Sequence, residues 1–130
     1  MSLNLATLLT ESVKRHPTNT AIIFDDFKMS YGQLHAASNM FANALLNNGL
    51  EQGQKVAMML PNIPQFLVVY YGILKAGGVV VPLNVLLKAP EVAYHLEDSD
   101  SGILVAWEAF LEAAAGWWSS TRPAPRIYPR

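Results

Sequence analysis

The sequence contains no cysteine, which excludes disulfide bonds, thiolate nucleophiles and cysteine-based metal sites. Charged residues are also scarce, at 15% of the chain against about 25% in typical domains. The net charge is −1 and no basic tract is present, so nucleic acid is not an expected partner. The N-terminus lacks the pattern of a signal peptide. We expect a cytoplasmic protein, and peripheral association with a membrane stays open.

A long uninterrupted apolar run is missing as well. Residues 66–87 carry one charge, Lys75, but the glycine pair at 77–78 and Pro82 also interrupt the stretch. The remaining run, 66–74, is far shorter than the roughly 20 residues that a membrane-spanning helix needs. The pattern indicates a buried helix followed by a buried strand, and we expect no transmembrane segment.

Apolar residues make up 52% of the 130-residue chain. A domain of this size can bury a core, but a free-standing one must also solvate a large surface. This balance therefore predicts apolar surface that faces other protein, either the remainder of a longer parent chain or a second copy.

The first part of the chain predicts a helix, a hairpin and a second helix. An amphipathic first helix follows from the spacing of Leu5, Leu8, Leu9 and Val13. The β-branched run 20–24 and the turn-like residues 25–28 predict the hairpin. Ser30 and Gln33 have the spacing of a capping box, and Gly49 is expected to end the helix that they begin.

The second helix is predicted to have one buried and one solvent-facing side. The expected buried stripe comprises Leu34, Ala37, Phe41, Ala44 and Leu45. The expected solvent side comprises His35, Asn39, Asn43 and Asn47.

From residue 55 onward, strands and helices alternate. Strands are expected at 55–60, 79–81 and 102–106, with helices at 63–76, capped by Asn62, and from Pro90 onward. Such units cross over right-handed and form a parallel sheet. The predicted fold is α/β: an incomplete three-layer domain whose parallel sheet is flanked by helices, plus a short N-terminal hairpin.

The last part of the sequence has a different character. No periodicity is visible after Ala115, and three prolines lie between Pro123 and Pro129. We interpret residues 107–130 as a poorly defined tail, truncated or non-native, and expect no regular structure there. The organised portion is expected to be residues 1–106.

Three stretches resemble the adenylate-forming ligases. Residues 29–34 (MSYGQL) are similar to the family's (T/S)Y-x-(E/Q)-L motif, and residues 53–62 (GQKVAMMLPN) to its G-D-x-V-A…L-x-N segment. Residues 74–84 (LKAGGVVVPLN) resemble L-K-A-G-(A/G)-x-x-x-P-(L/I)-(N/D) closely. The likeness runs from about residue 3 to about residue 106. The end of the third stretch, together with 90–94 (PEVAY), favours acyl-CoA synthetases over peptide-synthetase modules.

Two positions depart from the family pattern. Val85 stands where proline often follows the asparagine, and Ala89 stands where a threonine usually caps the next helix. Alanine is a poor N-cap, costing about 1 kcal/mol relative to threonine.

The resemblance implies that the parent protein is an acyl-CoA ligase for a fatty or related acid. It would use ATP and Mg to form an acyl-adenylate, and coenzyme A to form the thioester. The family's phosphate loop, aromatic-x-x-Thr-Glu segment, ribose-binding aspartate and late lysine do not occur here. We therefore assign this chain no catalytic, cofactor-binding or metal residue and expect it to be inactive alone. Two alternatives stay open: a non-catalytic truncated interaction module, and an unrelated flavodoxin-like binding domain, against which the missing phosphate loop argues.

Residues that could suggest chemistry have simpler interpretations. Gly77 and Gly78 follow a helix, so we interpret them as a helix stop and not as a phosphate loop. The strand-to-helix turn at 61–64 contains two prolines and offers no cradle of N–H groups. Asp98 and Asp100 begin like a calcium loop, but that loop's later glycine and glutamate are missing, and a solvated turn is favoured.

The histidines, Lys75 and the aromatic residues also have structural interpretations. The three histidines, His16, His35 and His95, are too scattered to predict one metal site. His35 and Ser38 have the spacing of a base and a nucleophile on one helical face, but surface polarity is favoured. Lys75 is expected to complement a helix dipole. Core or interface packing, and not an acyl pocket, is expected for Phe66, Tyr70, Tyr71, Trp107 and Phe110.

Overall fold

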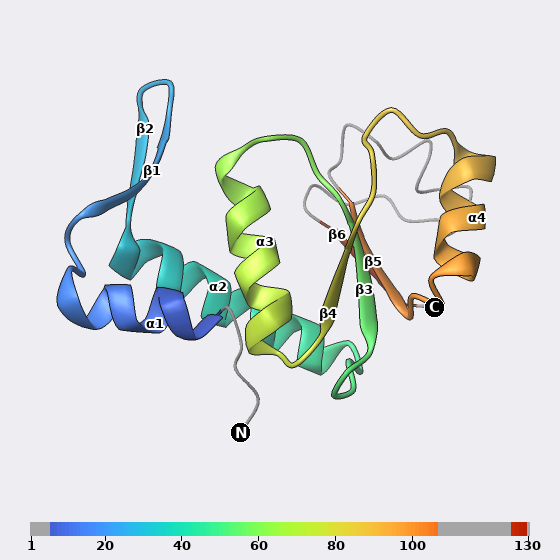
Figure 1. Ribbon diagram of the computed structural model, residues 1–130, viewed down its shortest axis with the longest axis horizontal. Coiled ribbons are helices and arrows are strands. Elements are labelled where there is room, and N and C mark those ends of the chain that lie inside the picture. Colours follow the sequence, from blue (N-terminus) through green and yellow to red (C-terminus); the bar gives the residue numbers. More distant parts are fainter. Residues whose placement is uncertain (1–5, 107–125, 130) are drawn as a thin grey trace.

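The computed structural model describes residues 6–106 and 126–129. Figure 1 shows the hairpin β1–β2 and helix α1 at one end, the sheet and α4 at the other, and α3 between them. The elements are, in chain order, α1 (Ala6–Arg15), β1 (Thr20–Phe24), β2 (Phe27–Ser30), α2 (Tyr31–Asn47), β3 (Lys55–Met59), α3 (Pro64–Lys75), β4 (Val79–Pro82), α4 (Ala89–Asp98), β5 (Ile103–Ala106) and β6 (Arg126–Pro129).

The predicted capping box at the start of α2 is confirmed. The Gln33 N–H donates to Ser30 Oγ at 3.1 Å, and the Ser30 N–H donates to Gln33 Oε1 at 2.9 Å. At the other end the helix stops at Asn47, and Gly49 has a φ of +91°. That left-handed conformation suits glycine, so the predicted start of α2 at the capping box and its predicted end before Gly49 are both confirmed.

The buried stripe of α2 differs in part from the prediction. Leu34 and Leu45 are buried as expected, but so are Ser38 and Ala42, which were not in the predicted set. The physical reason is that α2 is covered on two sides, by the hairpin and by α3, so small residues also lie inside. Asn39 is exposed as predicted, whereas His35 is half-buried because it faces α3.

Two predicted helix caps were wrong. Helix α3 begins at Pro64 with Ile63 as its N-cap and no side-chain cap bond, so Asn62 lies one residue too early. Helix α4 begins at Ala89 with Lys88 as its N-cap. There the Glu91 carboxylate accepts the Lys88 N–H at 3.3 Å, which fixes Lys88 as the boundary residue. Ala89 is therefore the first helical residue, where alanine carries no capping penalty.

The larger sheet has the strand order β4-β3-β5-β6. Strand β3 pairs in parallel with β4 and β5, which confirms the predicted parallel sheet. Strand β6 was not predicted: the backbone of Arg126–Pro129 pairs antiparallel with β5. An edge position tolerates the missing N–H of Pro129, so the proline signal did not exclude a strand. Residues 107–125, the rest of the predicted tail, lie outside the described residues.

The sheet is covered on both faces. Alternate residues of β3 point to opposite sides, as the pleat requires. Val56 and Met58 join a core with Val69 and Ile73 of α3. The opposite core is formed by Ala57, Met59, Leu104 and Ala106 of the sheet with Val92 and Leu96 of α4. A third cluster, centred on Leu9, Ile22 and Leu34, joins α1, the hairpin and α2.

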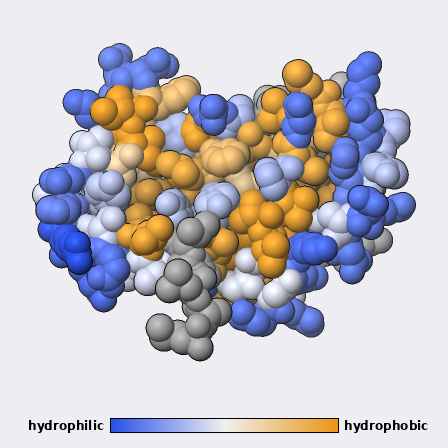
Figure 2. Space-filling model, viewed as in Figure 1, coloured by the Kyte–Doolittle hydropathy of each residue, from blue (hydrophilic) through white to orange (hydrophobic). Residues whose placement is uncertain are grey.

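Apolar side chains also reach the surface. Figure 2 shows them gathered over the hairpin and over the sheet half of the molecule. On the hairpin they include Ile23, Phe24 and Phe27, and at and beyond β4 they include Val79 and Leu86. No helix within the described ranges combines the length and the apolar character needed to cross a bilayer.

Candidate functional site

The topology of the parallel sheet marks one edge as the place for a ligand. The chain leaves β3 through α3 on one face to reach β4, and then passes through α4 on the other face to reach β5. Open sheets of this kind bind ligands outside the carboxyl ends of the strands, where the direction of the connections reverses. Here that point lies between β3 and β5, next to residues 60–64. The residues that follow β5 lie outside the described part of the chain.

The turn of residues 60–64 is poor in free backbone donors. Pro64 has no N–H, and the Ile63 N–H donates to the Pro61 carbonyl at 2.8 Å. One turn further on, the Phe66 N–H donates to the Ile63 carbonyl at 2.9 Å. Phosphate cradles need several outward N–H groups at a helix N-terminus, so this turn lacks what an anion requires.

The second turn at the same edge is built around Asn84 of the third motif. Its side-chain Oδ1 accepts the Leu86 N–H at 2.9 Å, and its carbonyl accepts the Leu87 N–H at 3.2 Å. The Leu83 N–H joins the turn to the sheet by donating to the Met58 carbonyl at 2.9 Å. Within the described residues, Asn84 thus shapes the path from β4 to α4.

Gly77 and Gly78 form the helix stop that the sequence predicts. The Gly77 N–H donates to the Leu74 carbonyl at 3.1 Å, and the Gly78 N–H donates to the Ile73 carbonyl at 2.9 Å. Gly77 has a φ of +86°, which an L side chain rarely adopts. These bonds close the end of α3 and turn the chain into β4.

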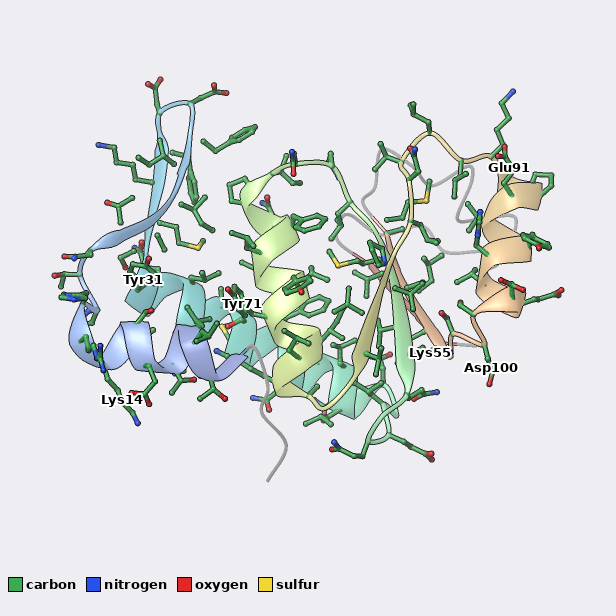
Figure 3. The ribbon with its side chains drawn as sticks, in the orientation of Figure 1. Lys14, Tyr31, Lys55, Tyr71, Glu91 and Asp100 are labelled. Carbon is green, nitrogen blue, oxygen red and sulfur yellow. The ribbon has the colours of Figure 1, made fainter. Side chains whose placement is uncertain are left out.

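The acidic residues near the end of α4 lie at the opposite edge of the sheet. Asp98 is the last residue of α4, and Asp100 follows in a turn with a φ of +55°. Figure 3 shows Asp100 and Lys55 at this amino edge, away from Glu91 at the carboxyl edge. Asp100 and Lys55 line an open hollow of about 440 Å³ together with Gly53, Gln54 and Gly102. Over residues 6–106 and 126–129, no three His, Asp or Glu side chains come together as metal ligands.

The three histidines remain apart. His16 follows α1, and His95 lies on α4 with its ring 5.5 Å from the Tyr94 ring. His35 alone enters a polar cluster, on the inner side of α2. The sequence placed it on the solvent side because helical spacing cannot show which neighbour will cover a polar residue.

That cluster is centred on the Lys75 ammonium. Lys75 Nζ lies 3.0 Å from His35 Nδ1 and 3.2 Å from the His35 carbonyl oxygen. It lies 2.6 Å from Ser38 Oγ and 2.9 Å from Asn39 Oδ1. The lysine thus ties the C-terminal end of α3 to one turn of α2. Burial lowers the pKa of Lys75 from its ordinary value.

Ser38 and Lys75 are residue types that can act as nucleophile and base, but a substrate cannot reach the Ser38 hydroxyl. Ser38 is 0% exposed, and its hydroxyl donates to the His35 carbonyl at 3.0 Å. A substrate carbon cannot reach an oxygen that is enclosed between two helices. The cluster therefore holds the helices together, and the base-and-nucleophile interpretation of His35 and Ser38 fails on access.

The aromatic residues of α3 serve packing. Phe66 and Tyr70 stack with ring centres 6.4 Å apart, against the core between α3 and the sheet. Tyr71 belongs to the cluster under the hairpin. Tyr31 and Tyr71, labelled in Figure 3, also line a small hollow of about 210 Å³ between α1, α2 and α3. Trp107 and Phe110 lie outside the described residues.

Comparison with known proteins identifies the family. Residues 9–125 match the model of the AMP-binding enzyme family. The chain is 37% identical over 110 residues to a long-chain-fatty-acid–CoA ligase of Bacillus subtilis, covering 85% of this chain and 20% of the relative. It is 33% identical over 108 residues to bacitracin synthase 3 of Bacillus licheniformis, covering 83% of this chain and 2% of the relative.

The fold agrees with these matches. The N-terminal domain of FACL13 from Mycobacterium tuberculosis superimposes with a TM-score of 0.83 at 30% identity, covering 94% of this chain and 32% of that one. The chain belongs to the AMP-binding enzyme family. Within that family it corresponds to the N-terminal part of an adenylate-forming enzyme and is similar to long-chain fatty-acid–CoA ligases.

Two consequences follow for the sequence interpretation. The family match excludes an unrelated flavodoxin-like domain. It also extends to residue 125, so the prediction that the likeness ends near residue 106 was wrong. The chain spans a fifth or less of the length of the curated ligases it matches.

Proposed function

We propose that this chain is the N-terminal part of an acyl-CoA ligase that activates a carboxylic acid, with fatty acids as the substrate class. In this reaction the carboxylate displaces pyrophosphate from ATP to form an acyl-adenylate, and the thiol of coenzyme A then displaces AMP. The likeness to the fatty-acid–CoA ligase of Bacillus subtilis carries the proposal. The motif at 74–84, whose glycine turn and Asn84 turn are both built as described above, supports it.

The role proposed for this chain is structural. It supplies β3, β4 and β5, whose carboxyl ends form one wall of the expected ligand edge. The groups that would hold ATP, Mg and coenzyme A are expected on the remainder of the parent chain, which is also the first proposed partner. We propose that the parent enzyme is cytoplasmic and that it can also associate peripherally with a membrane.

The purified 130-residue chain is expected to show no adenylation activity, because none of the nucleotide-contacting motifs occurs in it. The measurement is acid-dependent ATP–pyrophosphate exchange with a series of fatty acids and Mg, beside the full-length ligase of Bacillus subtilis as the positive control. Exchange above the acid-free background by this chain would overturn the structural role.

A second candidate function, a non-catalytic interaction module, is favoured by the exposed apolar residues of the hairpin. Ile23 is 68% exposed, and Phe24 and Phe27 are 41% and 46% exposed. Phe24 and Phe27 are cross-strand partners, so these two side chains lie on the same face of the hairpin. Exposed apolar surface of this kind marks protein contacts. We propose that the isolated chain associates with itself through this surface.

Light scattering at increasing concentration is expected to show oligomers, and a hydrophobic dye is expected to bind. The double variant Phe24→Ser/Phe27→Ser should reduce both signals, because it makes the hairpin surface polar. Met40→Ser is the matched control, since Met40 is 74% exposed on α2. A monomer without dye binding, or equal effects of the two variants, would contradict the proposal.

A further inference from the structure

Four polar atoms of α2 surround the Lys75 ammonium. Ser38 Oγ donates its proton to the His35 carbonyl, so it accepts from Lys75. The His35 carbonyl and Asn39 Oδ1 are acceptors by their chemistry. With His35 Nδ1 there are four acceptors for the three N–H groups of the ammonium, so one N–H is shared between two of them.

His35 Nδ1 lies at hydrogen-bonding distance from Lys75 Nζ, and it can accept from the ammonium only in the neutral tautomer whose proton is on Nε2. A proton added at Nδ1 would remove the acceptor and place a second cation 3.0 Å from the first.

We propose that His35 and Lys75 form a pH-sensitive latch, in which the neutral imidazole holds the end of α3 on α2 and protonation of the ring expels the Lys75 ammonium. The latch lies directly before the turn of Gly77 into β4. Release of Lys75 therefore loosens the helix end from which the edge strand of the sheet begins. This device is independent of the proposed ligase function, because it needs only the residues of α2 and α3.

The other charged groups near α2 do not share this role. Helix α1 carries Glu11, Lys14 and Arg15, and the hairpin carries Asp25, Asp26 and Lys28, and both elements contact α2. On α3 the remaining titratable groups are Tyr70 and Tyr71. Burial of the ring and, after it, the charge of Lys75 lower the pKa of His35.

The direction of the pH effect follows from that shift. A native-state pKa below the ordinary value, about 6.5, means that the unfolded chain binds more protons than the native chain in the window below that value. Stability is therefore fully present above about pH 6.5, falls as the pH drops toward the native-state pKa, and levels off below it.

The decisive measurement is an NMR titration of the His35 ring in the 130-residue chain between about pH 8 and 4.5. The ring is expected to titrate below the ordinary histidine value, and in Lys75→Met its pKa is expected to rise toward that value. Lys14→Met is the matched control, because Lys14 is an exposed lysine that pairs with Glu11 at 3.3 Å. It should leave the His35 titration unchanged.

A second variant separates the latch from a merely structural contact. His35→Asn keeps an oxygen acceptor near the position of Nδ1 but cannot be protonated. Its melting temperature is expected to fall less between pH 7.5 and pH 5 than that of the wild type. The proposal is overturned if His35 titrates at the ordinary value in the wild type, if Lys75→Met leaves its pKa unchanged, or if His35→Asn keeps the full pH dependence.

Discussion

Replacing Gly72 with valine is expected to lower the free energy of unfolding by about 3 kcal/mol, the upper end for overpacking a filled core. Gly72 lies where α3 crosses α2, and it is buried. A Cβ at this position would lie 2.9 Å from Phe41 Cδ1 and 3.2 Å from the Ser38 carbonyl oxygen. The backbone oxygen cannot move without disturbing the turn of α2 that holds Lys75. The better helix propensity of valine offsets only a few tenths of a kcal/mol.

The free energy of unfolding can be measured by urea denaturation followed by circular dichroism. Ala36→Val is the control, because Ala36 is exposed on α2 and also becomes valine in the middle of a helix. This control is expected to cost about 0.5 kcal/mol or less. Equal losses for the two variants would show that α2 and α3 do not approach each other closely at Gly72.

Leu45→Ala is expected to lower the free energy of unfolding by about 3 kcal/mol, since it combines lost burial with a new cavity. Leu45 is 0% exposed and lies in the core between α2, α3 and the sheet. The chain supplies its own control at the next position, because Leu46 is 50% exposed on the same helix. Leu46→Ala should cost less than about 1 kcal/mol.

The difference between the two leucine variants is the informative quantity. Both remove the same atoms from the same helix, so propensity effects cancel in the comparison. A cost for Leu46→Ala as large as that of Leu45→Ala would mean that the outer side of α2 is covered by protein in the species that was measured.

Local sequence signals predicted the elements that depend on local forces. The capping box of Ser30 and Gln33 and the stop at Gly77 each rest on bonds between residues a few positions apart. The alternation of strands and helices after residue 55 fixed the parallel sheet, because parallel neighbours need a crossover connection. The predicted N-caps of α3 and α4 were each wrong by one residue. Ile63 caps α3 without a side-chain bond, and the Lys88 N–H bond to Glu91 sets the start of α4, and neither was recognised from residue type.

Long-range partners were beyond such signals. His35 and Lys75 are separated by 40 residues, and nothing in the spacing of α2 indicates that an ammonium will replace solvent on that side. Strand β6 was missed for the same reason, because its pairing with β5 depends on an open sheet edge and not on its own composition. The signal that could have indicated the cluster is the spacing of Ser38, a polar residue four positions after Leu34 of the predicted buried stripe.

The candidate ligand edge was not predicted from the sequence, which indicated a parallel sheet but not the order of its strands. Its position follows from the order β4-β3-β5 in the structure. We propose that the side chains that give this edge its chemistry lie on the remainder of the parent chain, and we assign no site residue to this chain. In the family motif at 74–84, Gly77 and Asn84 stabilise turns through their hydrogen bonds.

The central position of β3 has a consequence for how the chain folds. Val56 pairs with Val80 on one side and with Ile103 on the other, so the middle strand of the sheet is synthesised before either of its neighbours. Closing these two loops costs chain entropy before any pairing is gained, which makes such sheets slow to form. During synthesis, β3 therefore leaves the ribosome before both of its neighbours, and its apolar run stays exposed with two unpaired edges until β4 and β5 follow.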